Sequence, residues 1–186
     1  MKNKKQEVLR KYDATADKYD SRYKQIQFTK YREILSFIKL RSEDIIIDIG
    51  CGTALFLDFL QKYDINIIGC DFSYKMLLEG KKKHPNSCFV CADADLLPFK
   101  KNSCDILTFI SVLQNSPKPA ITLNEGILFL KENGKIILSV LTNIFNLDDL
   151  SNLAKDADVK VEKIWKLKIE DYCLIGKKKD EKSIKC

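Results

Sequence analysis

The feature that most constrains this chain is an alternation of short, β-branched apolar runs with longer segments of helical periodicity. Near-continuous apolar runs are typical of parallel strands covered on both faces, and they occur at 44–50, 65–71, 88–91, 105–111 and 135–141. Helical spacing or helix-end signals mark the segments 31–38, 56–63, 73–84, 117–132 and 147–156. This alternation predicts a doubly wound α/β sheet with helices on both faces.

The C-terminal part departs from the alternation. Two further strands are predicted at 159–168 and 171–176, with only a short turn around Glu170–Asp171 between them. Because a parallel pair needs a crossover of about a dozen residues, these two strands must pair antiparallel. We therefore expect a Rossmann-like, seven-stranded sheet that is mostly parallel and ends in an antiparallel C-terminal hairpin.

The length favours one domain, and a hydrophobic content of 45% in 186 residues is enough to form a core. We divide this single domain into an N-terminal helical lid (1–41), an α/β core (42–176) and a basic tail (177–186). No apolar run approaches the ~18–20 residues that span a bilayer, so no membrane span is expected. The basic start is not followed by an apolar stretch, which argues against a secretory signal. Seven cysteines, an odd number, are interpreted as reduced thiols and favour a cytoplasmic location.

The net charge of +6 is distributed unevenly. Residues 1–41 carry 12 Lys and Arg against 5 Asp and Glu, whereas residues 42–158 carry 11 against 16. One interpretation is a set of solvated lysines on helices. The other is attraction for an anionic partner, such as RNA, a phosphorylated metabolite or an acidic protein surface.

A glycine-rich turn follows the first predicted strand, in the sequence Asp48-Ile49-Gly50-Cys51-Gly52-Thr53-Ala54. Glycine allows a tight turn and a close approach of the backbone to a ligand. The helix that follows offers free N–H groups at its start. The second strand ends in Asp71, an acid placed to accept hydrogen bonds from the two hydroxyls of a ribose. Together these features indicate an adenosine-containing cofactor.

The spacing of the glycines argues against a dinucleotide. A dinucleotide fingerprint has a third glycine at the position of Leu55, whereas the small residue here is Ala54. The chain also lacks the P-loop pattern G-x-x-x-x-G-K-[ST]. An NAD(P)-dependent oxidoreductase therefore remains only as an alternative.

Several segments, in order, resemble the class I S-adenosylmethionine-dependent methyltransferases. Asp48–Ala54 is similar to their first motif, Gly69–Leu77 to the second, and Ala92–Phe99 to the loop that binds adenine. Near the amino terminus, Tyr12–Asp20 resembles the "Tyr-Asp-x-x-Ala-x-x-Tyr-Asp" helix of methylases of the ubiquinone/menaquinone-biosynthesis type. The resemblance runs from about Tyr12 to Gly176 and implies S-adenosyl-L-methionine as the cofactor.

The resemblance also implies roles for individual residues. The methionine part of the cofactor would be lined by Gly50 and Gly52, with Asp48 orienting its amino group through the backbone or water and Tyr19 near its carboxylate. The ribose and adenine would contact Asp71, Phe72, Asp93 and Ala94, and Ser111 would border the methyl-donor pocket. Each side chain also has a purely structural interpretation, as a turn former, a cap or a packing residue.

No general base is evident in the sequence. Gln114 and Asn115, after the fourth strand, are the candidates for orienting an acceptor, and the lid would include the loop Thr142–Asn146. We expect no metal site, because the pair Cys88 and Cys91 lacks further ligands, and we interpret its thiols as buried. The short lid predicts an open acceptor site, which fits a large substrate or completion by a partner protein.

The leading hypothesis is methyl transfer to an unidentified acceptor, which could be a small molecule, RNA or protein. The charge of residues 1–41 suggests that this acceptor is anionic, with Lys24, Lys30 and Arg32 as the residues to neutralise in a test. The alternative is a catalytically inactive S-adenosylmethionine-binding module with a regulatory or interaction role.

Overall fold

The computed structural model describes residues 2–179, and its centre is a single seven-stranded sheet. The strand order is β3-β2-β1-β4-β5-β7-β6. The strands are β1 (Ile45–Ile49), β2 (Asn66–Asp71), β3 (Cys88–Cys91), β4 (Cys104–Ile110), β5 (Leu130–Leu141), β6 (Val159–Lys166) and β7 (Asp171–Lys178). The first five pair in parallel, whereas β7 pairs antiparallel with both β5 and β6. The predicted doubly wound sheet with an antiparallel C-terminal hairpin is confirmed.

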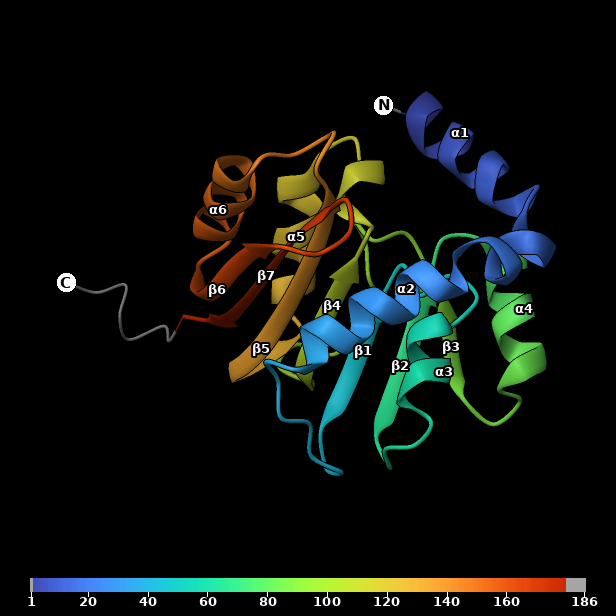
Figure 1. Cartoon of the computed structure of the whole chain (residues 1–186), viewed down its shortest axis with the longest axis horizontal. Helices are drawn as coiled ribbons and strands as arrows, with labels where there is room; N and C mark the ends of the chain where they lie inside the picture. The colour runs from blue at the N-terminus through green and yellow to red at the C-terminus, as the bar shows by residue number, and fades with distance from the viewer. Residues whose placement is uncertain (1, 180–186) are drawn as a thin grey trace.

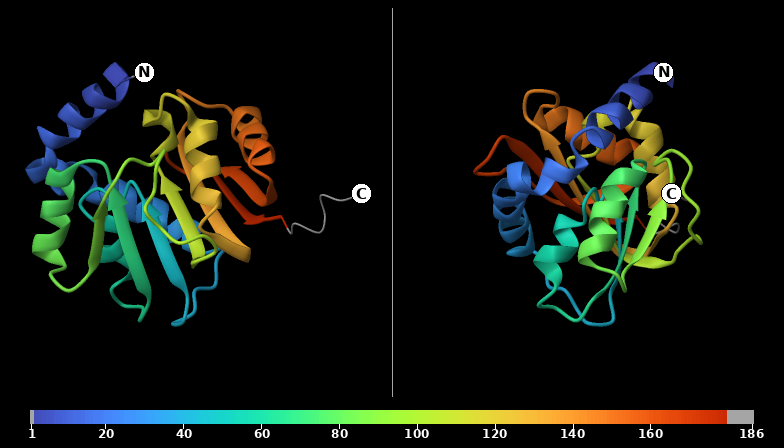
Figure 2. Two further views of the ribbon diagram at one scale, coloured as in Figure 1. Left: turned by 180° about the vertical axis from the view of Figure 1, so that it is seen from behind. Right: turned by 90° about the vertical axis from the view of Figure 1, so that its right-hand side faces the viewer.

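Helices cover both faces of the sheet, because the strands are apolar on both sides. On one face α2 (Tyr19–Leu35) and α3 (Leu55–Leu60) pack against alternate strand residues such as Ile46. On the other face α5 (Pro119–Ile127) and α6 (Leu147–Asp156) pack against residues such as Ile47. Figure 1 shows α2 crossing the front of the sheet, and the reverse view in Figure 2 shows α5 and α6. The adjacent residues Ile46 and Ile47 thus belong to two separate cores, as the two-residue period of a strand requires.

The remaining helices are α1 (Lys2–Asp13), above the end of the sheet where the parallel strands finish, and α4 (Tyr74–Lys83), beside the β3 edge. The 3₁₀ turn η1 (Ala16–Lys18) connects α1 to α2 (Figure 1). Helix α4 follows β2 and contacts both α1 and β3. No helix forms between β3 and β4, where residues 92–103 run as a loop. The expected N-terminal helices are therefore present, but only α1 stands over the strand ends, while α2 is part of the packed core.

Two predicted boundaries are wrong. The helix predicted over 117–132 ends at Ile127, and the chain enters β5 at Leu130, which pairs with Cys104 before a register shift. Asn133 there has a φ of 60°, so Gly134 is within an irregular strand instead of ending a helix. The basic tail does not begin at 177, because Lys177 pairs with β5 and β6 inside the sheet. Residues 180–186 of that tail lie outside the described residues.

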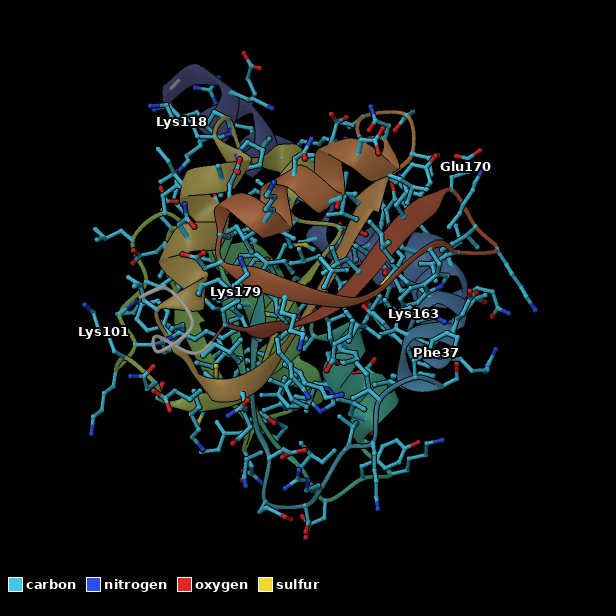
Figure 3. The ribbon with its side chains drawn as sticks, turned by 90° about the vertical axis from the view of Figure 1, so that its left-hand side faces the viewer. Phe37, Lys101, Lys118, Lys163, Glu170 and Lys179 are labelled. Atoms are coloured by element: carbon cyan, nitrogen blue, oxygen red, sulfur yellow. The ribbon has the colours of Figure 1, made fainter. Side chains whose placement is uncertain are left out.

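The edge strand β3 differs from its predicted environment. Cys88 and Cys91 were expected to be buried, but both are exposed, because β3 is at the edge of the sheet. At the opposite edge, the Lys163 ammonium of β6 is 4.0 Å from the centre of the Phe37 ring, and Figure 3 shows these two residues together. None of the helices between residues 2 and 179 combines the length and apolarity needed to cross a membrane.

Candidate functional site

The glycine turn after β1 adopts a conformation that few other residues could take. Gly50 and Gly52 have φ angles of 71° and 56°, in the left-handed region. A Cβ on Gly50 would be 2.3 Å from Val112 Cγ2, whereas one on Gly52 would be 3.1 Å from the flexible end of Met76. Ala54 also has a positive φ, 64°, so the chain accepts a methyl group at the third position of the motif. The turn thus brings bare backbone to the carboxyl end of the sheet.

Asp71, at the end of β2, holds this turn in place. Its two carboxylate oxygens each accept a backbone N–H at 2.8 Å, one from Gly52 and one from Ser73. Burial raises the pKa of the carboxyl group, although the backbone donors act in the opposite direction. Each oxygen keeps a free lone pair after these bonds. The carboxylate can therefore accept two further hydrogen bonds from a ligand.

A single pocket lies over the glycine turn and Asp71, between α1 and the strand ends. Eight of the nine predicted cofactor-binding residues line it, and so does Asn115, a candidate for orienting an acceptor. The eight are Tyr19, Gly50, Gly52, Asp71, Phe72, Asp93, Ala94 and Ser111. The apolar part of the wall consists of Val8, Ile49, Met76, Ile110 and Val112. Acids are thus at one end, a serine and an asparagine at the other, and apolar side chains between them. The loop Thr142–Asn146, expected in the lid, does not line the pocket.

The acidic end of the pocket is closed by a lysine from α1. The ammonium of Lys5 is 2.6 Å from Asp93 Oδ1 and 2.5 Å from Asp95 Oδ2. The Asp95 backbone N–H donates to Asp93 Oδ1, which is the turn-forming role that its sequence position suggests. No local spacing in the sequence indicated Lys5, because its two partners are about 90 positions away. Charge complementarity between residues 1–41 and the acidic middle was the available signal.

The tyrosines and the aspartates of the Tyr-Asp repeat near the amino terminus have different roles. Tyr12 and Tyr19 line the pocket, and burial raises the pKa of both phenols. Asp13 accepts the hydroxyl hydrogen of Ser73, the N-cap of α4, and Asp20 accepts that of Thr53 in the glycine turn. The tyrosines thus form the wall, and the aspartates fasten it to the core.

Ser111, directly after β4, has a positive φ of 60°, and both its backbone N–H and its Oγ take part in hydrogen bonds within the protein. Its backbone N–H donates to the carbonyl and the hydroxyl oxygen of Ser139, and its Oγ accepts from the ammonium of Lys30. Asn115 donates through Nδ2 to the Tyr12 hydroxyl at 3.2 Å. Gln114, the other candidate for orienting an acceptor, is buried and does not line the pocket.

Asp48 and Lys30 are both buried away from the pocket, so the indirect role of Asp48 stays a prediction and the expectation for Lys30 is wrong. Asp48 is buried beneath the turn, where its Oδ1 accepts the Thr108 hydroxyl, and it does not line the pocket. Burial raises the pKa of Asp48 to about 7. Lys30 was expected to face an acceptor, but it is buried and bonded to Asp171 at 2.8 Å. Burial also lowers the pKa of Lys30.

Comparison with known families agrees with this geometry. Residues 47–138 match the family model of the methyltransferase domain. Residues 47–138 thus carry a methyltransferase domain. The chain is 27% identical over 137 residues to a demethylmenaquinone methyltransferase of Paenarthrobacter aurescens. This aligned region covers 72% of this chain and 54% of that protein. The chain thus spans about half the length of the curated relatives it matches.

Solved structures share the fold of this methyltransferase domain. A methyltransferase in complex with the Haloferax volcanii Trm112 methyltransferase activator matches with a TM-score of 0.83 and 17% identity, covering 91% of this chain and 98% of its own. An S-adenosylmethionine-dependent methyltransferase of Aquifex aeolicus matches with a TM-score of 0.78 and 14% identity, covering 90% and 98%. The domain and its relatives indicate S-adenosylmethionine as the cofactor.

The residues of the pocket fit that cofactor. The carboxylates of Asp71 and Asp93 suit the hydroxyls and the amino group of an adenosine, and the apolar wall suits its uncharged parts. Gly50 and Gly52 of the glycine turn also line this pocket, so their backbone can contact a bound ligand. Within residues 2–179, no three His, Cys, Asp or Glu side chains gather in a way that could hold a metal ion.

Proposed function

We propose that this protein transfers the methyl group of S-adenosylmethionine to an acceptor that enters this pocket. The observation that supports this most directly is the pocket itself, in which the acids after β2 and β3 and the serine after β4 line one cavity across the glycine turn. A ligand that places its ribose at Asp71 extends over β1 toward Ser111. Its reactive centre would then be between the two ends, beside the apolar wall.

The residues of the chain would act by binding and orientation. Asp71 would accept the ribose hydroxyls, Asp93 the adenine amino group, and the backbone of Gly50 and Gly52 would contact the methionine part. S-adenosylmethionine supplies an electrophilic methyl group, so the protein needs to hold the acceptor in line and exclude water. The tyrosines of the N-terminal segment and Ile110 provide the apolar cover for this.

Calorimetry with S-adenosylmethionine, S-adenosylhomocysteine and NADH tests cofactor binding. We expect binding of the first two and none of NADH. Absence of binding by both methionine-derived ligands would refute the proposal, and tight binding of NADH would favour an oxidoreductase. Transfer of labelled methyl groups into fractionated cell extract then separates an enzyme from a protein that only binds the cofactor, which is the alternative function.

We further propose that the acceptor is anionic, on narrower grounds than the net charge of residues 1–41. Lys5 and Lys30 are both ion-paired within the protein, so they do not attract a substrate. Lys4 is exposed and bonds to the carbonyl of Ser116, a residue of the pocket wall, so it lies at the rim. Lys4→Gln should therefore reduce acceptor use and leave S-adenosylhomocysteine affinity unchanged, with the exposed Lys101→Gln, in the loop before β4, as the control.

We also propose that a partner protein completes the acceptor site. A methyltransferase of the same fold was solved in complex with an activator protein. The cytoplasm remains the proposed location, which agrees with free thiols at all six cysteines in the described part of the chain. Co-purification of the tagged chain from its own cell extract, followed by the labelled-methyl assay with and without the captured protein, tests the partner. Equal methyl transfer in the two assays would refute this proposal.

A further inference from the structure

A buried ion pair lies directly behind the serine end of the pocket. The Lys30 ammonium of α2 is 2.8 Å from Asp171 Oδ2 of β7, and the two side chains are only 2% and 4% exposed. The same ammonium donates to Ser111 Oγ at 2.5 Å. Ser111 lines the pocket, whereas Lys30 and Asp171 do not. The pair therefore touches the site only through Ser111.

The hydrogen bonds around Ser111 determine where its own hydroxyl hydrogen can point. Because Lys30 has only N–H donors, Ser111 Oγ must accept in that contact, and its O–H remains free to donate. The acceptor inside the protein is Asp171 Oδ2, at a distance of 3.5 Å. That oxygen already accepts from Lys30 at 2.8 Å and from Ser139 at 3.2 Å. A ligand oxygen in the pocket would therefore be the better partner for the Ser111 hydroxyl.

Burying a charged pair is costly, and nothing in the packing of the fold requires one here. Two charges removed from water lose solvation that their mutual attraction often only balances, so apolar residues of similar size can replace them without loss of stability. The pair does, however, connect α2 and β7 to Ser111, which follows β4 and lines the pocket. Ser111 also has a left-handed backbone, which is unfavourable for serine and must be maintained by its surroundings.

We propose that Lys30 and Asp171 are positioning residues that fix Ser111 as a hydrogen-bond donor toward the end of the ligand at β4. The inference rests on the proposed function, because that function orients the ligand with its nucleoside at Asp71. The strand order puts β4 on the opposite side of β1 from β2, so the ligand end near Ser111 is the amino-acid part. The group recognised by Ser111 is then an oxygen of that part.

Two ligands separate this contact from the rest of the site. S-adenosylhomocysteine contains the amino-acid part, whereas 5′-methylthioadenosine contains the nucleoside without it. Three variants are compared with the wild type by calorimetry at a temperature where all are folded: Ser111→Ala, the charge-free double variant Lys30→Met/Asp171→Leu, and the triple variant that combines them. Thermal unfolding of each variant is measured in parallel.

We expect Ser111→Ala to weaken S-adenosylhomocysteine binding about tenfold, since one hydrogen bond to a charged group is lost. The double variant should show the same loss at nearly wild-type stability, and the triple variant should bind no worse than either. Binding of 5′-methylthioadenosine should change less than about twofold throughout. A purely structural pair would alter unfolding and both ligands together, without this selectivity.

The outcomes distinguish the two levels of the argument. Wild-type affinity of a folded double variant for S-adenosylhomocysteine, or losses that multiply in the triple variant, would overturn the positioning role and leave the proposed function intact. A wild-type protein that binds neither ligand would refute the proposed function and, with it, this inference. If the double variant does not fold, Ser139→Ala replaces it, because it removes only the 3.2 Å bond to Asp171 and the bond to the Ser111 N–H. The same selectivity and the same non-additivity with Ser111→Ala are then required.

Discussion

The replacement Asp71→Asn separates the functional role of this carboxylate from its structural role. Burial raises the pKa of Asp71, so the ionised group reduces the stability of the folded state, and the neutral amide removes that cost. Against this gain, one of the two backbone bonds at 2.8 Å is lost, because the amide nitrogen must face the N–H of Gly52 or Ser73. A lost bond to a charged group costs about 1.5–3 kcal/mol, which offsets the gain.

We therefore expect the melting temperature of Asp71→Asn to change by less than about 6 °C, given roughly 2–4 °C per kcal/mol for a domain of this size. Affinity for S-adenosylhomocysteine should fall at least about tenfold, because a charged acceptor of ribose hydroxyls becomes partly a donor. Thermal unfolding followed by circular dichroism, together with calorimetry, measures both quantities. The exposed Asp64→Asn is the matched control. Unchanged affinity would remove Asp71 from the site, and a much larger fall in melting temperature would show that its role is mainly structural.

Three further predictions follow from the site. Burial raises the pKa of Asp48 to about 7, so as the pH rises the unfolded chain loses this proton before the folded protein does, and wild-type stability should fall between about pH 4 and 7. Chemical denaturation of Asp48→Asn over the same pH range should lack this part of the fall, and the same pH dependence in both proteins would contradict the reasoning. Gly50→Ala should reduce the unfolding free energy by roughly 1–3 kcal/mol more than Gly52→Ala does, since only the first variant places a methyl group 2.3 Å from the branched side chain of Val112. Equal losses in the two variants would argue against that contact. Lys5→Met should free α1 from Asp93, which limited proteolysis would report as faster cleavage within residues 2–13; an unchanged cleavage rate would show that other contacts hold the helix.

The sequence predicted the sheet well because its signals are local. A β-branched run such as 44–50 and a turn such as Gly50–Gly52 each specify their own conformation, and the order of strands and helices then leaves few topologies. The acids at the strand ends were found for the same reason, since Asp71 and Asp93 follow strands directly. Whether a strand lies at the edge of the sheet depends on the whole topology and not on its own residues, so the exposure of Cys88 and Cys91 was not predicted.

The parts of the site that were missed depend on distant pairs. Lys5 meets Asp93 across 88 residues, and no periodicity encodes that contact. Lys30 has the helical position of a solvated lysine, and only the packing of α2 on the sheet turns it inward to Asp171. Asp48, whose predicted role was indirect, accepts the hydroxyl hydrogen of Thr108, a partner 60 positions away that the sequence did not reveal.

The partnership of Lys30 with Asp171 also has a consequence for the order of folding. The two residues are 141 positions apart, so the lysine is synthesised long before the acid that neutralises it. Because docking α2 before β7 exists would bury an unpaired ammonium, we expect α2 to stay undocked until the last strand has been made. The wall of the pocket, although first in the chain, would then be among the last parts to close. Nascent chains stalled with their exposed end before residue 171 should leave α2 open to protease, and a protected α2 in such chains would contradict this order.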